Sequence, residues 1–549
     1  MNISSSLNRK AVASLRLTLL VGMLAASSLA FSQSGVETTV EPYAGPVVAP
    51  AGELAVAPAM QLKVPAARLR TPAQMLAAQA ARAPEEAAQP QQTPFLPTLG
   101  DAAYRAAKAA AAQQGMAANA ARAQPGMAPL APPFFVGPRF EGVRQTEAGG
   151  GFPPDTHGAV GRNHFVEVTN FHVDIYTKAG ARVRSVSLAS FFGYTAQTLF
   201  DPRVVYDRSY DRYIIIADAR PESSTVQRHF MAISRTGDPL GGYFIYNINT
   251  TGFAGTNNFW DYPQLGMDQD SIITTGNVFS PTSFIGWRMF AVAKARLYNG
   301  LGFSVPVFAG AASDGTLAPP MVLDQNAKTF LISAPSGGSA LRLYTMRDSS
   351  RNPGVSLTGP VSITVPAYAL PPDAQQCGGV GTAEMLDTLD ARFVNASTQS
   401  GNFLWNVHSI DFAGPAVRWY RIDTNSLILN KSSTFWASST SSDFNASIAA
   451  NDAGDIFLNW SSSSSTVCPE IRFSGQRSAD AADTGRNGFV LFSSPTKLTG
   501  NFDSRFGTQR WGDYSAVTVD PLNSLRGWIV NEKVNASNVW GSGIGQIGF

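Results

Sequence analysis

One pattern recurs in four stretches of this chain, and "QRWGDYSAVTVDP" (residues 509–521) shows it most plainly. The others are "FWDYPQLGMDQD" (259–270), "FDPRVVYDRSYD" (200–211) and "LDARFVNASTQS" (389–400). In each of these acidic phrases, an acidic residue leads into a short apolar run. A phrase that returns along a chain is typical of folds built from repeated units.

The acidic phrases mark a period. Units begin at intervals of roughly fifty to seventy residues, near Asp155, Asp201, Asp261, Pro319, Asp390, Asp443 and Asp513. The sequence between them is rich in β-branched and aromatic residues and in Gly and Asp turns, which leaves room for about four strands in each unit. We therefore predict an all-β fold over residues 134–549, a β-propeller with seven blades. A pair of β-sandwiches is the structural alternative, but it does not account for a repeated phrase.

The two ends of this domain suggest how the ring closes. The segment "FFVGPRFEGVRQ" (134–145) precedes the first unit, and the last unit, residues 511–549, is short. Both observations are explained if the first strand completes the last blade.

We predict that polar residues at and near the acidic phrases form a ligand-binding site. Side chains two apart on a strand share a face, so they are expected to converge, partly solvated, at the channel mouth. The predicted ligand-binding residues are Asp155, Asp201, Arg203, Asp261, Asp390, Arg392, Asp513 and Tyr514. Alternatively, the carboxylates cap loops by accepting backbone N–H bonds, and each Asp–Arg pair neutralises itself.

Catalysis is harder to assign. Glycoside hydrolysis needs two carboxylates around the sugar, and elimination from a uronate needs a base and a cation. The catalytic candidates are His157, His408 and Tyr514. A lone strand histidine is more often structural, and the chain has no HExxH, GxSxG, P-loop or EF-hand motif. No cofactor is expected. Asp207 and Asp211 are expected to form a turn, with a Ca²⁺ ion bound there as the alternative.

Composition excludes some partners. The chain has 549 residues, 44% of them hydrophobic and 15% charged, with a net charge of +2. Basic residues do not cluster with aromatic ones, which argues against nucleic acid as a partner. An extracellular polysaccharide or surface protein is the expected partner, and a monomer is the expected state.

Residues 1–32 have the pattern of a secretory signal peptide. A basic stretch precedes an apolar run, and small residues follow, so cleavage is expected after Ala30 or Ser32. An uncleaved membrane anchor is the alternative, but the apolar run is shorter than the ~20 residues that a membrane span needs. We predict a secreted protein, located outside the cell, in the periplasm or at the cell surface, with no transmembrane segment after cleavage.

The mature chain has two cysteines, Cys377 and Cys468. In an oxidising compartment they are expected to form a disulfide, with two free thiols as the alternative. Neither has another Cys or a His at ligand spacing, so no metal site is predicted there.

Residues 33–133 are dominated by Ala, Pro and Gln. They hold few large apolar side chains and should not form a core, so we predict a disordered linker, stalk or pro-segment. A helix that folds on binding is the alternative.

Several phrases together resemble a family of secreted bacterial proteins described only as hypothetical β-propellers. They are "PPDTHGAVGRNHFVEVTN", "LDARFVNASTQSGNFLWNVHSI", "VRWYRID", "SIAANDAGDIFLNW" and "RWGDYSAVTVDP". The resemblance covers most of residues 134–549. It implies a fold and an extracellular location, and no established reaction.

A weaker similarity is to sialidase-like propellers. "NDAGDIFLNW" has Asp452, Gly454 and Phe457 at the spacing of an Asp-box turn, with Ala450 where that box usually begins with Ser or Thr. Sialidases bind a carboxylate with three arginines and use a Tyr nucleophile with a Glu partner. The resemblance implies these parts in Arg203, Arg392, Arg510, Tyr514 and Glu384.

Binding of an extracellular ligand, with a glycan as the favoured class, is therefore the expected function. The alternatives are a propeller glycoside hydrolase or polysaccharide lyase, and a structural protein of the cell envelope.

Overall fold

The computed structural model describes residues 37–82, 92–118, 135–378, 381–480 and 488–549. Over these ranges the chain is mostly β, as the sequence predicts, and its helices are few. None of the helices in this part of the chain combines the length and apolar character needed to cross a membrane. The predicted signal peptide lies outside the described residues.

In the first half of the chain, strands pair antiparallel with the next strand along the sequence. The groups are β5 (His157–Val160), β6 (His164–Val168), β7 (His172–Thr177) and β8 (Arg182–Ser187); β9 (Leu199–Asp207), β10 (Arg212–Ala219), β11 (Arg228–Ser234) and β12 (Tyr243–Asn249); β13 (Phe259–Met267), β14 (Ser271–Phe279), β15 (Phe284–Ala293) and β16 (Phe303–Ala309). Short helices α3 (Leu188–Phe192), α4 (Thr251–Ala254) and α5 (Lys294–Leu297) follow β8, β12 and β15. In β10, "RYIIIADA", apolar residues run without alternation because both faces of the strand are buried.

The second half continues this arrangement. Its groups are β17 (Thr316–Ala318), β19 (Thr329–Ala334), β20 (Gly337–Arg347) and β21 (Ser356–Ala369); β22 (Ser397–Ser400), β23 (Phe403–Asp411), β24 (Pro415–Asp423) and β25 (Ile428–Phe435); β26 (Ser442–Ala450), β27 (Ile456–Ser463), β28 (Glu470–Gln476) and β29 (Phe489–Ser493). The last group has β32 (Ala516–Val519), β33 (Arg526–Val534) and β34 (Trp540–Gly548). Between groups lie β18 (Pro320–Val322), β30 (Phe502–Asp503), β31 (Thr508–Gln509) and the 3-10 helices η2 (Ala312–Asp314) and η3 (Thr382–Glu384).

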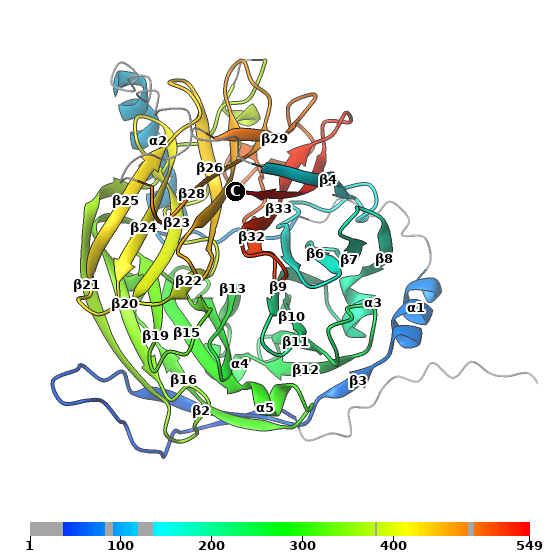
Figure 1. Cartoon of the computed structure of the whole chain (residues 1–549), viewed down its shortest axis with the longest axis vertical. Coiled ribbons are helices and arrows are strands. Elements are labelled where there is room, and N and C mark those ends of the chain that lie inside the picture. Colours follow the sequence, from blue (N-terminus) through cyan, green and yellow to red (C-terminus); the bar gives the residue numbers. More distant parts are fainter. Residues whose placement is uncertain (1–36, 83–91, 119–134, 379–380, 481–487) are drawn as a thin grey trace, which may run out of the picture. The chain divides into compact units, whose positions relative to one another are not determined.

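The inner strands, which are β18 next to the β17–β21 group and the first strand of every other group, contact one another in order around a ring. β5 contacts β9, β9 contacts β13, β18 joins β13 to β22, β22 contacts β26, β26 contacts β32, and β32 contacts β5 again. Figure 1 shows the groups following one another around this centre. Each predicted unit start lies within one of these inner strands or a few residues before it, and Asp390, at the greatest separation, is seven residues before β22, so the unit starts mark the inner edges of successive sheets.

The predicted closing strand is confirmed. β4 (Phe135–Arg144) pairs antiparallel with β34 as the outer strand of the last sheet, with Ile544 opposite Phe140. Phe140 also contacts the rings of Tyr176 in β7 and Trp528 in β33. One sheet is therefore built from both ends of the domain.

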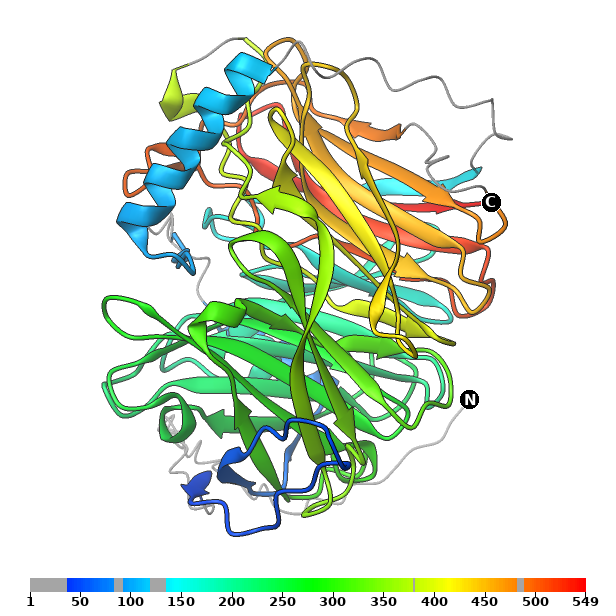
Figure 2. The same cartoon turned by 90° about the vertical axis from the view of Figure 1, so that its left-hand side faces the viewer.

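The predicted disorder of residues 33–133 is wrong for the described parts, 37–82 and 92–118. β1 (Thr39–Glu41) pairs with β2 (Pro58–Val64), β2 pairs with β16, and β3 (Arg68–Arg70) pairs with β12. Helices α1 (Pro72–Ala81) and α2 (Asp101–Ala118) follow, and Figure 2 shows α2 and the β1–β2 segment at separate places on the sheets. The segment has no core of its own because its large side chains bury against the sheets, namely Leu62, Val64, Met75, Phe95 and Tyr104.

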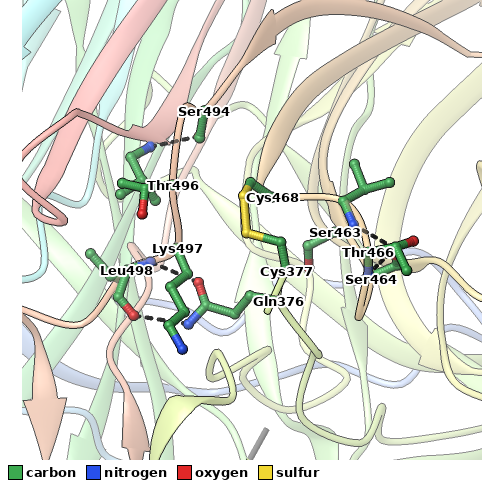
Figure 3. Close-up of a disulfide and its surroundings, with 12 residues drawn as sticks. Gln376, Cys377, Ser463, Ser464, Thr466, Cys468, Ser494, Thr496, Lys497 and Leu498 are labelled. Atoms are coloured by element: carbon green, nitrogen blue, oxygen red, sulfur yellow. Dashed lines mark hydrogen bonds between the residues drawn. A yellow bond between two sulfur atoms is a disulfide. The ribbon is translucent and has the colours of Figure 1, made fainter. Parts of the chain in front are cut away.

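The predicted disulfide is confirmed. Cys377 and Cys468 are bonded, with their Cα atoms 4.6 Å apart and a sequence separation of 91. Beside it, the Gln376 side-chain amide donates to the Leu498 carbonyl and accepts from the Leu498 N–H (Figure 3). The disulfide and this amide pairing tie together three parts of the chain that are distant in sequence.

Candidate functional site

An unusual backbone conformation recurs near several of the predicted unit starts. Asp155, Asp201, Tyr262 and Asn445 have φ values of 47°, 51°, 55° and 49°. In β9, β13 and β26 this residue lies where the strand pairing slips by a β-bulge. Asp and Asn adopt left-handed φ more readily than most residues, which explains why they recur here. A bulge also re-aims the side chains beside it, here toward the ring centre.

Arg203 lies between two tyrosine rings. Its guanidinium carbon is 3.3 Å from the ring centre of Tyr514 and 5.7 Å from that of Tyr262. Its Nε donates to the Pro263 carbonyl and its Nη1 to the carbonyl of Val394. Its Nη2 is buried and has no hydrogen-bond partner among the described residues.

Arg392 also lies against Tyr262, with its guanidinium carbon 4.3 Å from the ring centre. It forms an ion pair of 2.7 Å with Asp390, and its Nη1 is a second buried donor for which the described chain supplies no acceptor. Burial alone would raise the pKa of Asp390, but the charge and hydrogen bonds of Arg392 hold that pKa below its ordinary value. The Asp390–Arg392 pair therefore neutralises itself, as one of the alternatives expected.

Three of the remaining carboxyl groups, those of Asp155, Asp201 and Asp513, belong to a network that includes Asn170. The Asn170 amide donates to Asp155 Oδ2 at 2.5 Å, and its Oδ1 accepts the backbone N–H of Asp201 at 2.7 Å. Asp155 Oδ1 accepts the backbone N–H of Asp513, and the Tyr514 hydroxyl donates to Asp201 at 2.7 Å. Arg510 forms an ion pair of 2.8 Å with Asp513.

These carboxyl groups titrate abnormally. Burial, together with the nearby charge of Asp201, raises the pKa of Asp155 to about 7. Burial also raises the pKa of Asp513 to about 7, despite Arg510, and burial with repulsion from Asp218 raises that of Asp261 to about 8. Several of these acids are thus partly protonated near neutral pH, so that they can both donate and accept hydrogen bonds.

All eight predicted ligand-binding residues come together, and we call them, with Tyr262 and Arg510, the polar cluster. The expectation that they are partly solvated is wrong, because each is at most 3% exposed. They bury one another across several sheets, and part of the N-terminal segment covers them. Several carboxylates also accept backbone N–H bonds, as the capping alternative expected.

The cover consists of residues around Phe95. The Phe95 ring centre lies 5.3 Å from the guanidinium carbon of Arg392 and 5.2 Å from that of Arg510. The Leu96 carbonyl accepts from Arg392 Nη2 at 3.0 Å, and the Thr98 hydroxyl donates to Asp390 at 3.0 Å. No pattern in the sequence predicts this contact, because residues 92–98 repeat no phrase of the domain.

The two candidate histidines, His157 and His408, have different surroundings, and neither is placed as a catalytic base. His408 is in the core, with Nδ1 2.7 Å from the Ala391 carbonyl and Nε2 3.0 Å from the Tyr420 hydroxyl, and burial lowers its pKa to about 3. His157 accepts the Val204 N–H, and burial and Arg203 lower its pKa well below the ordinary value. It lines a cavity of ≈ 120 Å³ between the inner strands. Both surroundings fit the structural alternative.

Two other sequence candidates lie elsewhere. The Glu384 side chain is 36% exposed and forms an ion pair with Lys497, whereas Tyr514 is buried and its hydroxyl donates to Asp201, so the partner of Tyr514 is not the Glu that the sialidase resemblance implies. Asp207 accepts the backbone N–H groups of Ser209 and Tyr210 and is paired with Lys294, as a turn-forming Asp would be. Across the described residues, no group of three or more His, Cys, Asp and Glu side chains could hold a metal ion.

Two residues beside the polar cluster, Asn170 and Glu532, were not predicted from the sequence. Asn170 bridges Asp155 and Asp201, and Glu532 accepts the Gly512 N–H at 2.5 Å from the second strand of the last sheet. Neither lies in an acidic phrase, so the repeat could not reveal them. Asn170 follows a strand run ("FVEVTN"), where a polar residue carries no specific signal.

Comparison with known proteins gives only distant similarities. No family model matches the chain, and no curated protein matches it. Among solved structures, a protein of unknown function from Dyadobacter fermentans has a TM-score of 0.37 and 9% identity, covering 63% of this chain and 94% of its own. Trypanosoma rangeli sialidase has a TM-score of 0.34 and 10% identity, covering 76% and 60%. An exo-β-1,3-galactanase from Phanerochaete chrysosporium has a TM-score of 0.30 and 11% identity, covering 62% and 81%.

Proposed function

We propose that this chain is an exported, monomeric, seven-bladed β-propeller that binds a carboxylate-bearing glycan at the polar cluster. The closed order of inner-strand contacts and the pairing of β4 with β34 support the propeller. The cysteine pairing and the sequence of residues 1–32 support export. N-terminal sequencing of the secreted protein tests the expected cleavage after Ala30 or Ser32.

One observation carries the choice of ligand. Arg203 Nη2 and Arg392 Nη1 are buried donors, and no described residue accepts from them. Both guanidinium groups lie near Tyr262, with their carbons 5.7 Å and 4.3 Å from its ring centre. A buried donor without a partner is costly, so a ligand that supplies acceptor oxygens there is stabilised. A carboxylate suits guanidinium groups best, and the partly protonated carboxyl groups nearby suit sugar hydroxyls.

The test compares retention on polygalacturonate and on neutral dextran. Because Phe95 covers Arg392, both the wild-type chain and a Phe95→Ala/Thr98→Ala chain are used. In the latter, Arg203→Ala/Arg392→Ala should abolish retention on polygalacturonate, while Arg351→Ala, whose side chain is 76% exposed, should not. Folded arginine variants that are retained like their parent would refute the proposal.

Hydrolysis is the second candidate function, favoured by the contact between Tyr514 and Asp201. The phenol donates to the carboxylate at 2.7 Å beneath the Arg203 guanidinium, which places a nucleophile beside a base. Product release from an acidic polysaccharide should then be lost in Tyr514→Phe, while retention persists. If the parent chain is retained on the polysaccharide but releases no product, hydrolysis is refuted and only the binding function remains.

A further inference from the structure

The residues that cover the polar cluster occupy it much as a ligand would. The Leu96 carbonyl supplies an acceptor oxygen to Arg392, and the Phe95 ring fills the space between Arg392 and Arg510. Phe95 is only 2% exposed. A ligand that reaches these guanidinium groups must therefore displace Phe95.

Helix α2 anchors this cover through one of its faces. Asp101 forms an ion pair with Arg505, the Tyr104 hydroxyl donates to Asp387 at 2.9 Å, and Lys108 lies 3.1 Å from Asp373. Residues three and four apart on a helix lie on the same face. Much of the rest of the helix is alanine, so these polar contacts and the buried Tyr104 ring hold the helix on the sheets.

Such an attachment can be released without dismantling the sheets. Exposed ion pairs such as Asp101–Arg505 contribute little to stability. The apolar part of the contact depends on Phe95 and Tyr104, which pack edge-to-face on each other and on Phe506. By contrast, β2 and β3 are hydrogen-bonded into outer sheet edges.

We propose that residues 92–118 form a built-in plug that closes the polar cluster and must leave before the cluster binds its ligand. This inference rests on the proposed function for the identity of the ligand. That the plug controls access to Arg392 and Arg510 follows from the contacts described above and does not depend on which ligand binds. The plug also gives the 33–133 segment a role as an intramolecular inhibitor.

Phenylglyoxal, which modifies accessible arginine side chains, tests the plug without any ligand. In the folded wild-type chain, mass spectrometry should find Arg392 and Arg510 protected and the exposed Arg351 modified. Phe95→Ala/Thr98→Ala should raise modification of Arg392 and Arg510 about ten-fold by favouring local opening. The matched control, Leu99→Ala, removes a side chain that is 39% exposed and should change nothing.

Adding a synthetic peptide of residues 92–118 to the opened chain should restore protection. If the double variant does not fold, Tyr104→Phe/Lys108→Ala weakens the anchor instead and should give the same increase. Arginines that react freely in the wild type, or that stay protected in every folded variant, overturn the plug. If the arginines open but polygalacturonate is not retained, the plug stands and the proposed function fails.

Discussion

Asn445 illustrates how single residues hold the inner strands in place. Its φ is 49°, and its side-chain amide donates to the Gly512 carbonyl at 2.8 Å and the Tyr514 carbonyl at 3.2 Å. It therefore joins β26 to the loop before β32. The same residue meets a conformational and a hydrogen-bonding requirement, which few side chains other than Asn can do.

We expect Asn445→Ala to lower the free energy of unfolding by about 2–4 kcal/mol, from the unpaired carbonyls and the strained φ together. Asn445→Gly loses the same hydrogen bonds but has no strain at this φ, so it should lower the free energy of unfolding by less than Asn445→Ala does. Urea denaturation measures both. An alanine variant no less stable than the glycine variant would contradict the role assigned to the left-handed conformation.

Tyr262, like Leu389 with a φ of 60°, departs from the pattern in which Asp or Asn holds the left-handed position. Its φ is 55°, and its ring lies beside both Arg203 and Arg392. A bulky residue in this conformation is strained, and such strain gathers at functional sites. This agrees with a ligand site at Tyr262.

The raised carboxyl pKa values predict how stability changes with pH. Asp155 and Asp513, with pKa about 7, and Asp261, with pKa about 8, bind protons in the folded state that the unfolded chain, with Asp near 3.8, has already lost. Their contribution to stability is therefore present at low pH and is lost as pH rises through 7 to 8. Buried His229 and His408, with pKa lowered to about 3, oppose this trend only below pH ~6.5.

We therefore expect the melting temperature to fall between pH 6.5 and 8.5. Asp261→Asn removes one of the titrating groups and should make that fall smaller. Asp270→Asn, at an exposed position, is the control and should leave it unchanged. Calorimetry at a series of pH values checks this, and a melting temperature that rises across the window would show that the carboxyl groups are already ionised in the fold.

At the scale of strands and helices, the sequence was informative where a pattern repeated. Asp201 and Asp261 each lie in the first strand of a sheet, and β4 could be placed because the last unit lacked a strand. The N-terminal segment could not be placed in this way. Leu62, Phe95 and Tyr104 are isolated in an alanine-rich sequence, and only the surfaces supplied by distant strands make their burial favourable.

The same limit applies to the site. Strand alternation predicts that Arg203 and Arg392 face the ring centre, but it says nothing about depth. The polar cluster is buried by residues from other parts of the chain, such as Asn170 and Phe95. No local sequence pattern connects these residues to an acidic phrase.

Strand β2 provides a test of the N-terminal arm. Leu62 is fully buried and pairs with Val305 of β16, within the largest apolar cluster of that part of the chain. Leu62→Ala should lower the free energy of unfolding by about 2–5 kcal/mol, as expected for a buried leucine. Leu54→Ala, at a residue 71% exposed, should be near neutral in the same denaturation experiment. Equal effects would mean that the arm does not contribute to the core.

For the whole molecule, the Cys377–Cys468 disulfide closes a long loop. With a separation of 91 residues, its removal in Cys377→Ser/Cys468→Ser should cost up to about 4–5 kcal/mol on the chain-entropy account. Chemical denaturation measures the loss, and a reducing agent added to the wild type should give the same midpoint. A midpoint unaffected by either change would show that other contacts already hold these segments together.

The pairing of β4 with β34 has a consequence for the order of events during synthesis. The backbone of Gln145 is bonded to that of Trp540, 395 residues later. At ribosomal speeds of about 5–20 residues per second, β4 waits on the order of 20–80 s for its partner. Until then the last sheet is unfinished and its edge is open to wrong partners. A translation product that stops before Trp540 can never be sealed, so a cell that halts synthesis late is left with a nearly complete chain that is fit only for degradation.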